Sequence, residues 1–154
     1  MQEIVPQLHI SDAPATRKLP ADHDYNEVVT LGYFNQLGYT IPEASTTGDE
    51  FAFRDGPHDY ADFEAAVEYV LSALERGDRV LVHCQAGVSR SCGVCCAVLT
   101  DHEGVSLPDA YQMVREAREI VNPAPEIVES MERFAGEQLI PLPSGFHEYT
   151  SSED

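Results

Sequence analysis

The chain has 154 residues, of which 43% are hydrophobic and 23% are charged, and its formal net charge is −18. This length predicts a single domain that buries its own core, and the composition excludes a wholly disordered chain. The charge excludes binding to nucleic acid or to an anionic membrane through a general basic surface.

Positive charge comes almost entirely from arginine. Lys18 is the only lysine, and arginine supplies the other eight of the nine cationic side chains. An acidic, lysine-poor surface favours a halophilic protein, because concentrated salt screens the repulsion between its carboxylates. A mesophilic acidic protein is the alternative interpretation.

The cysteines lie close together, at positions 84, 92, 95 and 96. A secreted disulfide framework spreads its cysteines to close loops, so we expect reduced thiols and a cytoplasmic protein. Residues 1–12 have neither the basic start nor the apolar run of a signal peptide. The longest apolar stretch, residues 92–99, is too short to span a bilayer, and we expect a soluble protein.

The first half of the chain is rich in predicted strands. Residues 3–10 predict a first strand, and Asp12 can cap a short helical turn that extends through Leu19. The β-branched run in residues 25–31 predicts a second strand. Residues 32–49 have no clear period and predict a loop with room for one short strand. Residues 50–54 alternate polar and aromatic side chains, which predicts a further strand.

Helices dominate the second half. The clearest helix begins near Asp59 or Asp62 and ends before Gly77. Its apolar side chains recur at helical spacing: Tyr60, Phe63, Val67, Val70, Leu71 and Leu74. A strand at residues 80–82 comes next, then helices are expected over residues 91–102, 106–121 and 125–137. This order predicts an α/β or α+β sheet covered by helices, with a domain over residues 1–140 and a loosely held polar tail over 141–154.

The stretch around Cys84 has the composition of an anion site. A buried strand leads into Cys84, a turn containing Gly87 follows, and Arg90 precedes the next helix. Backbone amides of such a turn, the helix N-terminus and the guanidinium fork all favour a bound phosphate dianion. The same groups favour the thiolate form of Cys84, which we expect to attack phosphorus.

A poor leaving group requires a general acid. The favoured candidate is Asp55, which follows a predicted strand in a turn with Gly56 and Pro57. Asp59 is the alternative, although its position suits the N-cap of the long helix. Ser91 can donate a hydrogen bond to the sulfur and help it leave in a second step, and His83 can orient the loop.

The run His83-Cys84-Gln85-Ala86-Gly87-Val88-Ser89-Arg90-Ser91 resembles the signature of the cysteine-based protein phosphatases, His-Cys-x5-Arg-Ser/Thr, and most closely its dual-specificity branch. Residues 4–10, 53–55 and 122–123 resemble further segments of that family, so the likeness covers roughly residues 3 to 136. The resemblance implies an α/β fold with a central, mostly parallel sheet flanked by helices.

The resemblance also implies the roles of the site residues. Cys84 is then the nucleophile, Asp55 the general acid and Ser91 the hydroxyl that assists hydrolysis. The phosphate is bound by Gln85, Ala86, Gly87, Val88, Ser89 and Arg90. No cofactor and no metal is implied, and the partner is a phosphoprotein or phosphopeptide.

Two features bear on the substrate. Gln85 and Val88 are neutral where phosphoinositide-directed relatives carry lysines, so we expect protein phosphoesters rather than lipid headgroups. The chain is also too short for the segments that deepen the pocket of tyrosine-only phosphatases. We therefore expect a shallow site that accepts phosphoserine, phosphothreonine and phosphotyrosine.

Other interpretations concern the remaining cysteines and turnover itself. Cys92 and Cys95 have the Cys-x-x-Cys spacing of a thiol-disulfide oxidoreductase, but three buried packing thiols, with Cys96, are the favoured reading. Cys92 is also a candidate for a reversible disulfide that protects Cys84 from over-oxidation. A phosphate-binding module without turnover is the remaining alternative.

Overall fold

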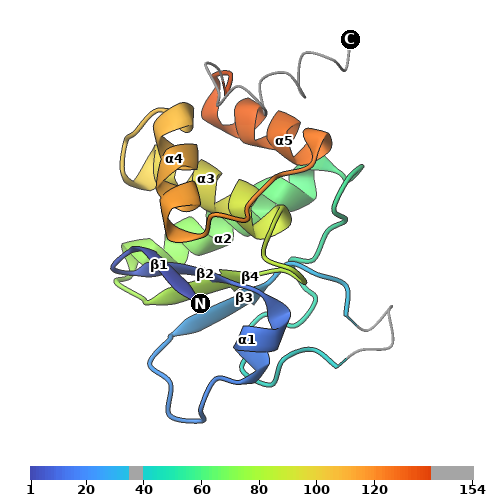
Figure 1. The fold of residues 1–154 in the computed structure, drawn as a ribbon, viewed down its shortest axis with the longest axis vertical. Coiled ribbons are helices and arrows are strands. Elements are labelled where there is room, and N and C mark those ends of the chain that lie inside the picture. Colours follow the sequence, from blue (N-terminus) through green and yellow to red (C-terminus); the bar gives the residue numbers. More distant parts are fainter. Residues whose placement is uncertain (35–39, 140–154) are drawn as a thin grey trace.

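The structure, a computed structural model, describes residues 1–34 and 40–139. Within these residues, four strands form one sheet in the order β1-β2-β4-β3 (Figure 1). β1 (Gln2–Val5) and β2 (Leu8–Ser11) are antiparallel, whereas β2, β4 (Val80–His83) and β3 (Glu27–Thr30) run parallel. The predicted α/β fold with a mostly parallel central sheet is confirmed.

The first predicted strand is in fact a hairpin. A turn at Pro6 and Gln7 divides residues 3–10 into β1 and β2, which pair from Gln2 with Ile10 to Val5 with Leu8. Proline donates no ladder hydrogen bond and suits a turn, so an unbroken strand through position 6 was a wrong prediction.

The helices cover both faces of the sheet unequally. Figure 1 shows α1 (Ala13–Arg17) on one face and α2 to α5 on the other. The larger layer contains α2 (Tyr60–Glu75), α3 (Arg90–His102), α4 (Leu107–Ala117) and α5 (Pro125–Ala135). α3 lies inside this layer, in contact with α2, α4 and α5, and its segment from Ser91 to Leu99 is buried.

Capping residues lie at the helix ends where the sequence predicts them. Asp12 accepts a hydrogen bond from Ala15 N–H at 2.8 Å, and Ser106 accepts one from Asp109 N–H at 3.2 Å. Gly104, after α3, has a φ of +68°. α4 and α5 are shorter than predicted, because α4 ends at Ala117 and α5 at Ala135.

The strand predicted at residues 50–54 is absent, and this prediction was wrong. Residues 50 and 51 lie in a turn, and Phe53 makes one ladder-like bond, its N–H donating to Leu31 O at 3.1 Å. The outer edge of β3 is already occupied, since Thr46 and Thr47 hydroxyls accept from its amides. The aromatic alternation instead buries Phe53 in the core, where it is 1% exposed.

The remaining predictions concern connecting segments. The described part of the predicted loop, residues 32–34 and 40–49, contains no strand. The predicted polar tail, residues 141–154, lies outside the described residues. Among the described helices, none combines the length and apolar character needed to cross a bilayer.

Candidate active site

Cys84 directly follows the central strand of the sheet. β4 lies between β2 and β3, and its last residue, His83, is in register with Ser11 of β2 and Thr30 of β3. The carboxyl ends of the parallel strands therefore meet at one edge, which is where open α/β sheets bind ligands. Cys84 is 3% exposed, so its thiol lies at the base of this edge.

The loop after Cys84 turns its carbonyl groups away from the thiol. Gln85 O accepts from Ala13 N–H at 3.0 Å, and Val88 O accepts from Asn122 N–H at 2.8 Å. Ala13 begins α1 and Asn122 follows α4, so both partners come from segments far from the loop in the sequence. The loop is thus held from outside by the surrounding fold.

Arg118, just beyond α4, holds the middle of the loop. Its Nε donates to Gly87 O at 2.8 Å, and its Nη2 donates to Ala86 O at 3.0 Å and to the Asp12 carboxylate at 3.1 Å. Gly87 has a φ of +68°, and a Cβ there would lie 2.7 Å from Ser11 O. Glycine alone adopts this positive φ readily and has no Cβ to collide with Ser11 O.

The amides of the loop are left for a ligand. Within residues 1–34 and 40–139, nothing accepts a hydrogen bond from the backbone N–H groups of residues 85–90. They precede the N-terminus of α3, which carries a positive partial charge. Successive free amides at a helix N-terminus form a site for an anion.

Arg90 adds a cation whose orientation is fixed. Its Nη1 donates to Phe53 O at 2.9 Å and to Leu31 O at 3.4 Å. Its Nε is buried and has no hydrogen-bond partner among the described residues. A buried donor without a partner is costly, so this nitrogen is suited to a ligand oxygen.

Ser91 contacts the thiol from the first turn of α3. Its Oγ lies 3.3 Å from Cys84 Sγ, and its side chain is buried. A hydroxyl at this distance can donate to a thiolate.

His83 supports the loop from beneath. Its buried ring donates from Nδ1 to Cys84 O at 3.1 Å. Burial lowers the pKa of His83 to about 4, because the protonated ring would lose its hydration. The imidazole is therefore neutral at pH 7.

Asp55 lies on a segment that Arg90 holds against the loop. It is exposed, and it comes two residues after Phe53, whose carbonyl Arg90 binds. Asp59 occupies the N-cap position of α2, where its backbone carbonyl accepts from Asp62 N–H at 3.0 Å. The structure brings Cys84, Arg90 and Ser91 together, and the general-acid role of Asp55 stays a prediction.

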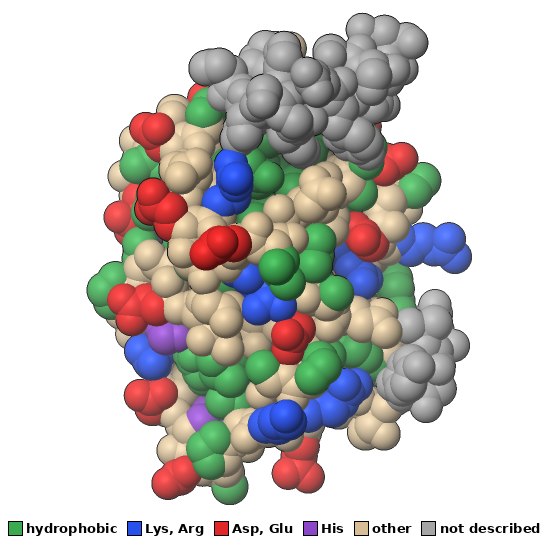
Figure 2. Space-filling view, viewed as in Figure 1, with side chains coloured by type: hydrophobic (Ala, Val, Ile, Leu, Met, Phe, Trp, Pro, Cys, Tyr) green, Lys and Arg blue, Asp and Glu red, His purple; other side chains and the backbone are tan. Residues whose placement is uncertain are grey.

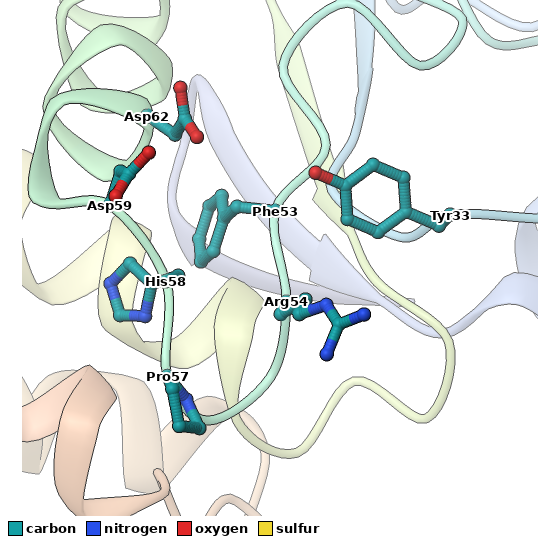
Figure 3. Close-up of a pocket in the computed structure, with 7 residues that line it drawn as sticks. All are labelled: Tyr33, Phe53, Arg54, Pro57, His58, Asp59 and Asp62. Atoms are coloured by element: carbon teal, nitrogen blue, oxygen red, sulfur yellow. The ribbon is translucent and has the colours of Figure 1, made fainter.

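A pocket of about 450 Å³ lies beside this segment (Figure 3). Asp59 and Asp62, at the start of α2, lie on one side of the ring of Phe53, and Arg54 and Tyr33 lie on the other side. Its lining consists of Tyr33, Phe53, Arg54, Pro57, His58, Asp59 and Asp62. The pocket therefore adjoins the candidate site without containing the thiol.

A family model described as the catalytic domain of dual specificity phosphatases matches residues 54–136, which is more than half of the chain. The chain belongs to the dual specificity phosphatase family. This family assignment confirms the resemblance carried by the residues around Cys84.

Individual relatives agree with the family assignment. The chain is 35% identical to mouse dual specificity protein phosphatase 1 over 79 residues, which are 51% of this chain and 22% of that protein. The match thus spans about a fifth of the length of this relative.

Solved structures of dual specificity phosphatases and their relatives share the fold. Human DUSP28 superimposes with a TM-score of 0.73 at 25% identity, covering 88% of this chain and 96% of that one. The human tyrosine phosphatase-like serine/threonine/tyrosine-interacting protein has a TM-score of 0.74 at 25% identity, with 88% and 95% covered.

The other cysteines of this member of the dual specificity phosphatase family pack inside α3. Cys92, Cys95 and Cys96 are each 0% exposed, and Cys92 Sγ lies 4.0 Å from Cys96 Sγ. Burial raises the pKa of Cys95 and of Cys96. Buried thiols in mid-helix fit the packing interpretation, because a redox pair needs an accessible, readily ionised sulfur.

Arg118 is the important site residue that sequence reasoning missed. It lies at the C-cap of α4, four residues after Val114, the last buried residue of that helix, and a lone arginine there gives no sign of its partners. Its side chain is 9% exposed, which is unusual for arginine and follows from its four acceptors in the loop and at the N-terminus. A single cation near the segment Asn122-Pro123 was the only signal in the sequence.

Proposed function

We propose that the chain hydrolyses phosphotyrosine, phosphoserine and phosphothreonine in proteins through a phosphocysteine intermediate. The observation that carries this proposal is the set of unused donors around Cys84: the amides of residues 85–90 and Nε of Arg90. A phosphate dianion bound by these donors presents its phosphorus to the thiol. Donors already in place cost little reorganisation when charge develops during transfer.

In the first step the Cys84 sulfur attacks phosphorus. The S–P bond forms, the bond from phosphorus to the ester oxygen breaks, and Asp55 transfers its proton to the departing oxygen. Arg90 binds the equatorial phosphate oxygens, while its Nη1 remains on the carbonyls that fix it.

In the second step water replaces sulfur. Asp55, now ionised, takes a proton from the water as its oxygen bonds to phosphorus and the S–P bond breaks. Ser91, 3.3 Å from the sulfur, donates to the departing thiolate. Inorganic phosphate then leaves, and the thiolate is restored without any cofactor.

The side chains of the loop favour protein substrates. Gln85 and Ala86 are exposed and neutral, and Val88 is apolar, so the rim of the loop adds no cation for a highly phosphorylated headgroup. The adjoining pocket of about 450 Å³ provides space for residues next to the phosphorylated side chain.

Hydrolysis of p-nitrophenyl phosphate tests the proposal. We expect turnover by the wild-type chain that chelators leave unchanged, and no turnover by Cys84→Ser, because a serine hydroxyl is not ionised at neutral pH. A wild-type chain that is inactive in both low and high salt would refute the proposal.

Two further measurements separate the alternatives. Binding of inorganic phosphate without turnover would indicate a phosphate-binding module. Reduction of insulin disulfides that is lost in Cys92→Ala would indicate an oxidoreductase, although burial of Cys92 and Cys95 argues against it. Phosphopeptides compared with inositol phosphates would then test the preference for proteins.

A further inference from the structure

The segment that carries Asp55 has no backbone ladder to hold it. In the part of the chain that the structure describes, no backbone–backbone hydrogen bond involves residues 54–58, although the backbones of Phe53 and Asp59 on either side are paired. Pro57 has no N–H to donate. The path of this segment therefore depends on side chains that bind its carbonyl groups.

Side chains bind the backbone on both sides of Asp55. Nη1 of Arg90 donates to Phe53 O, two residues before Asp55, at 2.9 Å. Nδ1 of His58 lies 2.6 Å from Gly56 O, directly after Asp55, and donates to it because a carbonyl oxygen can only accept. Gly56 is buried, and a buried carbonyl needs such a partner.

The second nitrogen of the His58 ring contacts α5. Its Nε2 lies 2.8 Å from Ser130 Oγ, although the two residues are 72 positions apart in the chain. The hydroxyl can donate to a bare Nε2 or accept from a protonated one, so this contact suits either state of the ring. The imidazole thus connects the carbonyl of Gly56 to a helix that lies far away in the sequence.

Ser130 is an unusual residue for its place in α5. It is 6% exposed and shares the buried face of the helix with Ile127, Val128 and Met131. A buried hydroxyl on an apolar face is costly unless it is hydrogen-bonded, and His58 supplies the partner. The polar side chain at this position is therefore explained by its contact with the segment that carries Asp55.

The two attachments of this segment come from helices that pack together. Arg90 begins α3, and α3 packs against α5. The ring of His58 is also confined by aromatic neighbours, with ring centroids 5.1 Å from Phe53 and 6.2 Å from Phe63. Figure 3 shows the rings of His58 and Phe53 side by side. Asp55 itself is exposed, so its carboxyl remains accessible while the backbone around it is held.

We propose that His58 and Ser130 are positioning residues, which connect the Asp55 segment to α5 and so restrict where the carboxyl lies relative to Cys84. A general acid must lie within hydrogen-bond reach of the departing oxygen, and a misplacement of about 1 Å can cost about 10²-fold in rate. The proposal rests on the proposed function for its effect on turnover, but not for the order of the segment.

Kinetics with two leaving groups provide the first test, read as kcat/KM, which reports the steps up to formation of the phosphocysteine. Ser130→Ala should lower kcat/KM about tenfold for an alkyl phosphate, the effect of one lost hydrogen bond. For p-nitrophenyl phosphate it should stay within about twofold of wild type, because that leaving group needs little protonation. Ser130→Thr keeps the hydroxyl and should recover most of the loss. Equal losses for both esters would indicate a merely structural role and refute the proposal.

A double variant identifies the group through which Ser130 acts. In Asp55→Asn, which has no acid to position, the further change Ser130→Ala should lower kcat/KM for the alkyl phosphate no further. A second tenfold loss there would contradict the proposal. Thr100→Val is the matched control, because the Thr100 hydroxyl binds Ala97 O within α3, away from the segment. It should leave kcat/KM unchanged for both esters.

Backbone order parameters from amide NMR test the attachment without turnover. We expect wild-type values for Asp55 and Gly56 near about 0.85, as in rigid backbone, with lower values in Ser130→Ala and the lowest in His58→Ala. Wild-type values below about 0.6, or values that Ser130→Ala leaves unchanged, would refute the positioning role even if the chain hydrolyses phosphate esters.

The two kinds of failure are distinguishable. A wild-type chain without turnover refutes the proposed function, whereas its order parameters still decide whether the segment is held. Ser130→Ala keeps the tests decisive if His58→Ala fails to fold, because it removes a single hydroxyl and alanine favours a helix.

Discussion

Asp55 and Asp59 lie four residues apart but have different surroundings. Asp55 is exposed and lies in a turn next to Gly56, which has a φ of +123°. Asp59 is also exposed, but its backbone begins α2 by accepting from Asp62 N–H. The first is free to approach a leaving group, and the second belongs to the end of a helix.

Replacement of each aspartate should therefore have a different effect. We expect Asp55→Asn to lower kcat by roughly 10²- to 10⁴-fold for alkyl phosphates, the range of general acid catalysis. The loss should be smaller for p-nitrophenyl phosphate, whose leaving group needs little protonation. Asp59→Asn, the matched control, should keep its kcat for alkyl phosphates within about twofold of wild type. A larger loss in Asp59→Asn would assign the acid to that position instead.

Protonation of His83 should couple folding stability to pH. The ordinary pKa of histidine is 6.5, and burial lowers it to about 4 in the folded chain. Between these values the unfolded chain binds a proton that the folded chain does not, so stability is full above pH 6.5 and falls as the pH drops toward 4. The full loss is on the order of 3 kcal/mol.

Urea unfolding between about pH 7 and about pH 4.5 measures this effect. His83→Gln should show a shallower decline than wild type. Part of the decline should remain, because burial also lowers the pKa of His9, with the same sign. An identical decline in both chains would show that His83 does not contribute.

At the scale of elements, α3 determines how the site and the core are joined. Its first turn supplies Arg90 and Ser91 to the site, while its next turn packs against α2 and α5. The closest approach is at Gly93, where a Cβ would overlap Cγ2 of Ile127 and lie 3.3 Å from Cε1 of Phe63. A change in this packing would move the helix that carries Arg90.

Gly93→Ala should destabilise the chain by about 1–3 kcal/mol, because the added methyl group overpacks the contact with α5. Helix propensity alone predicts the opposite sign, since alanine favours a helix over glycine by about 1 kcal/mol. The free energy of unfolding, measured in urea, distinguishes overpacking from helix propensity. Ser72→Ala, on the exposed face of α2, is the control and should be neutral or slightly stabilising. A higher free energy of unfolding in Gly93→Ala than in wild type would show that α3 and α5 can move apart at little cost.

For the whole molecule, the net charge of −18 dominates the long-range electrostatics. Figure 2 shows acidic side chains spread over the visible face rather than gathered in one patch. Ion pairs offset little of this charge, and those of Arg76 and Arg79 are at the surface, where salt bridges contribute little. Repulsion among the carboxylates therefore opposes the compact state.

The halophilic interpretation predicts that salt stabilises the folded chain. We expect the urea midpoint to rise from dilute buffer to molar KCl, because the screening length falls from about 10 Å at 0.1 M to about 3 Å at 1 M. KCl and NaCl at equal ionic strength should act alike if screening is the cause. Equal midpoints in dilute buffer and in molar KCl would favour the mesophilic interpretation.

The sequence by itself determined the local structure around Cys84 and predicted the chemistry that we propose there. Periodic apolar residues define α2, Asp12 and Ser106 define helix starts, and the spacing from Cys84 to Arg90 predicts an anion loop before a helix. These features depend on interactions between near neighbours in the chain. The pattern of residues within a few positions therefore specifies them.

Only the tertiary structure decided how distant residues meet at the site. Arg118 binds carbonyls 31 and 32 residues earlier, and Thr30 meets His83 across 53 residues. The predicted strand at 50–54 failed for the same reason, since Thr46 and Thr47 occupy the sheet edge that it would need. Such contacts depend on the packing of whole elements, which leaves no periodic trace in the sequence.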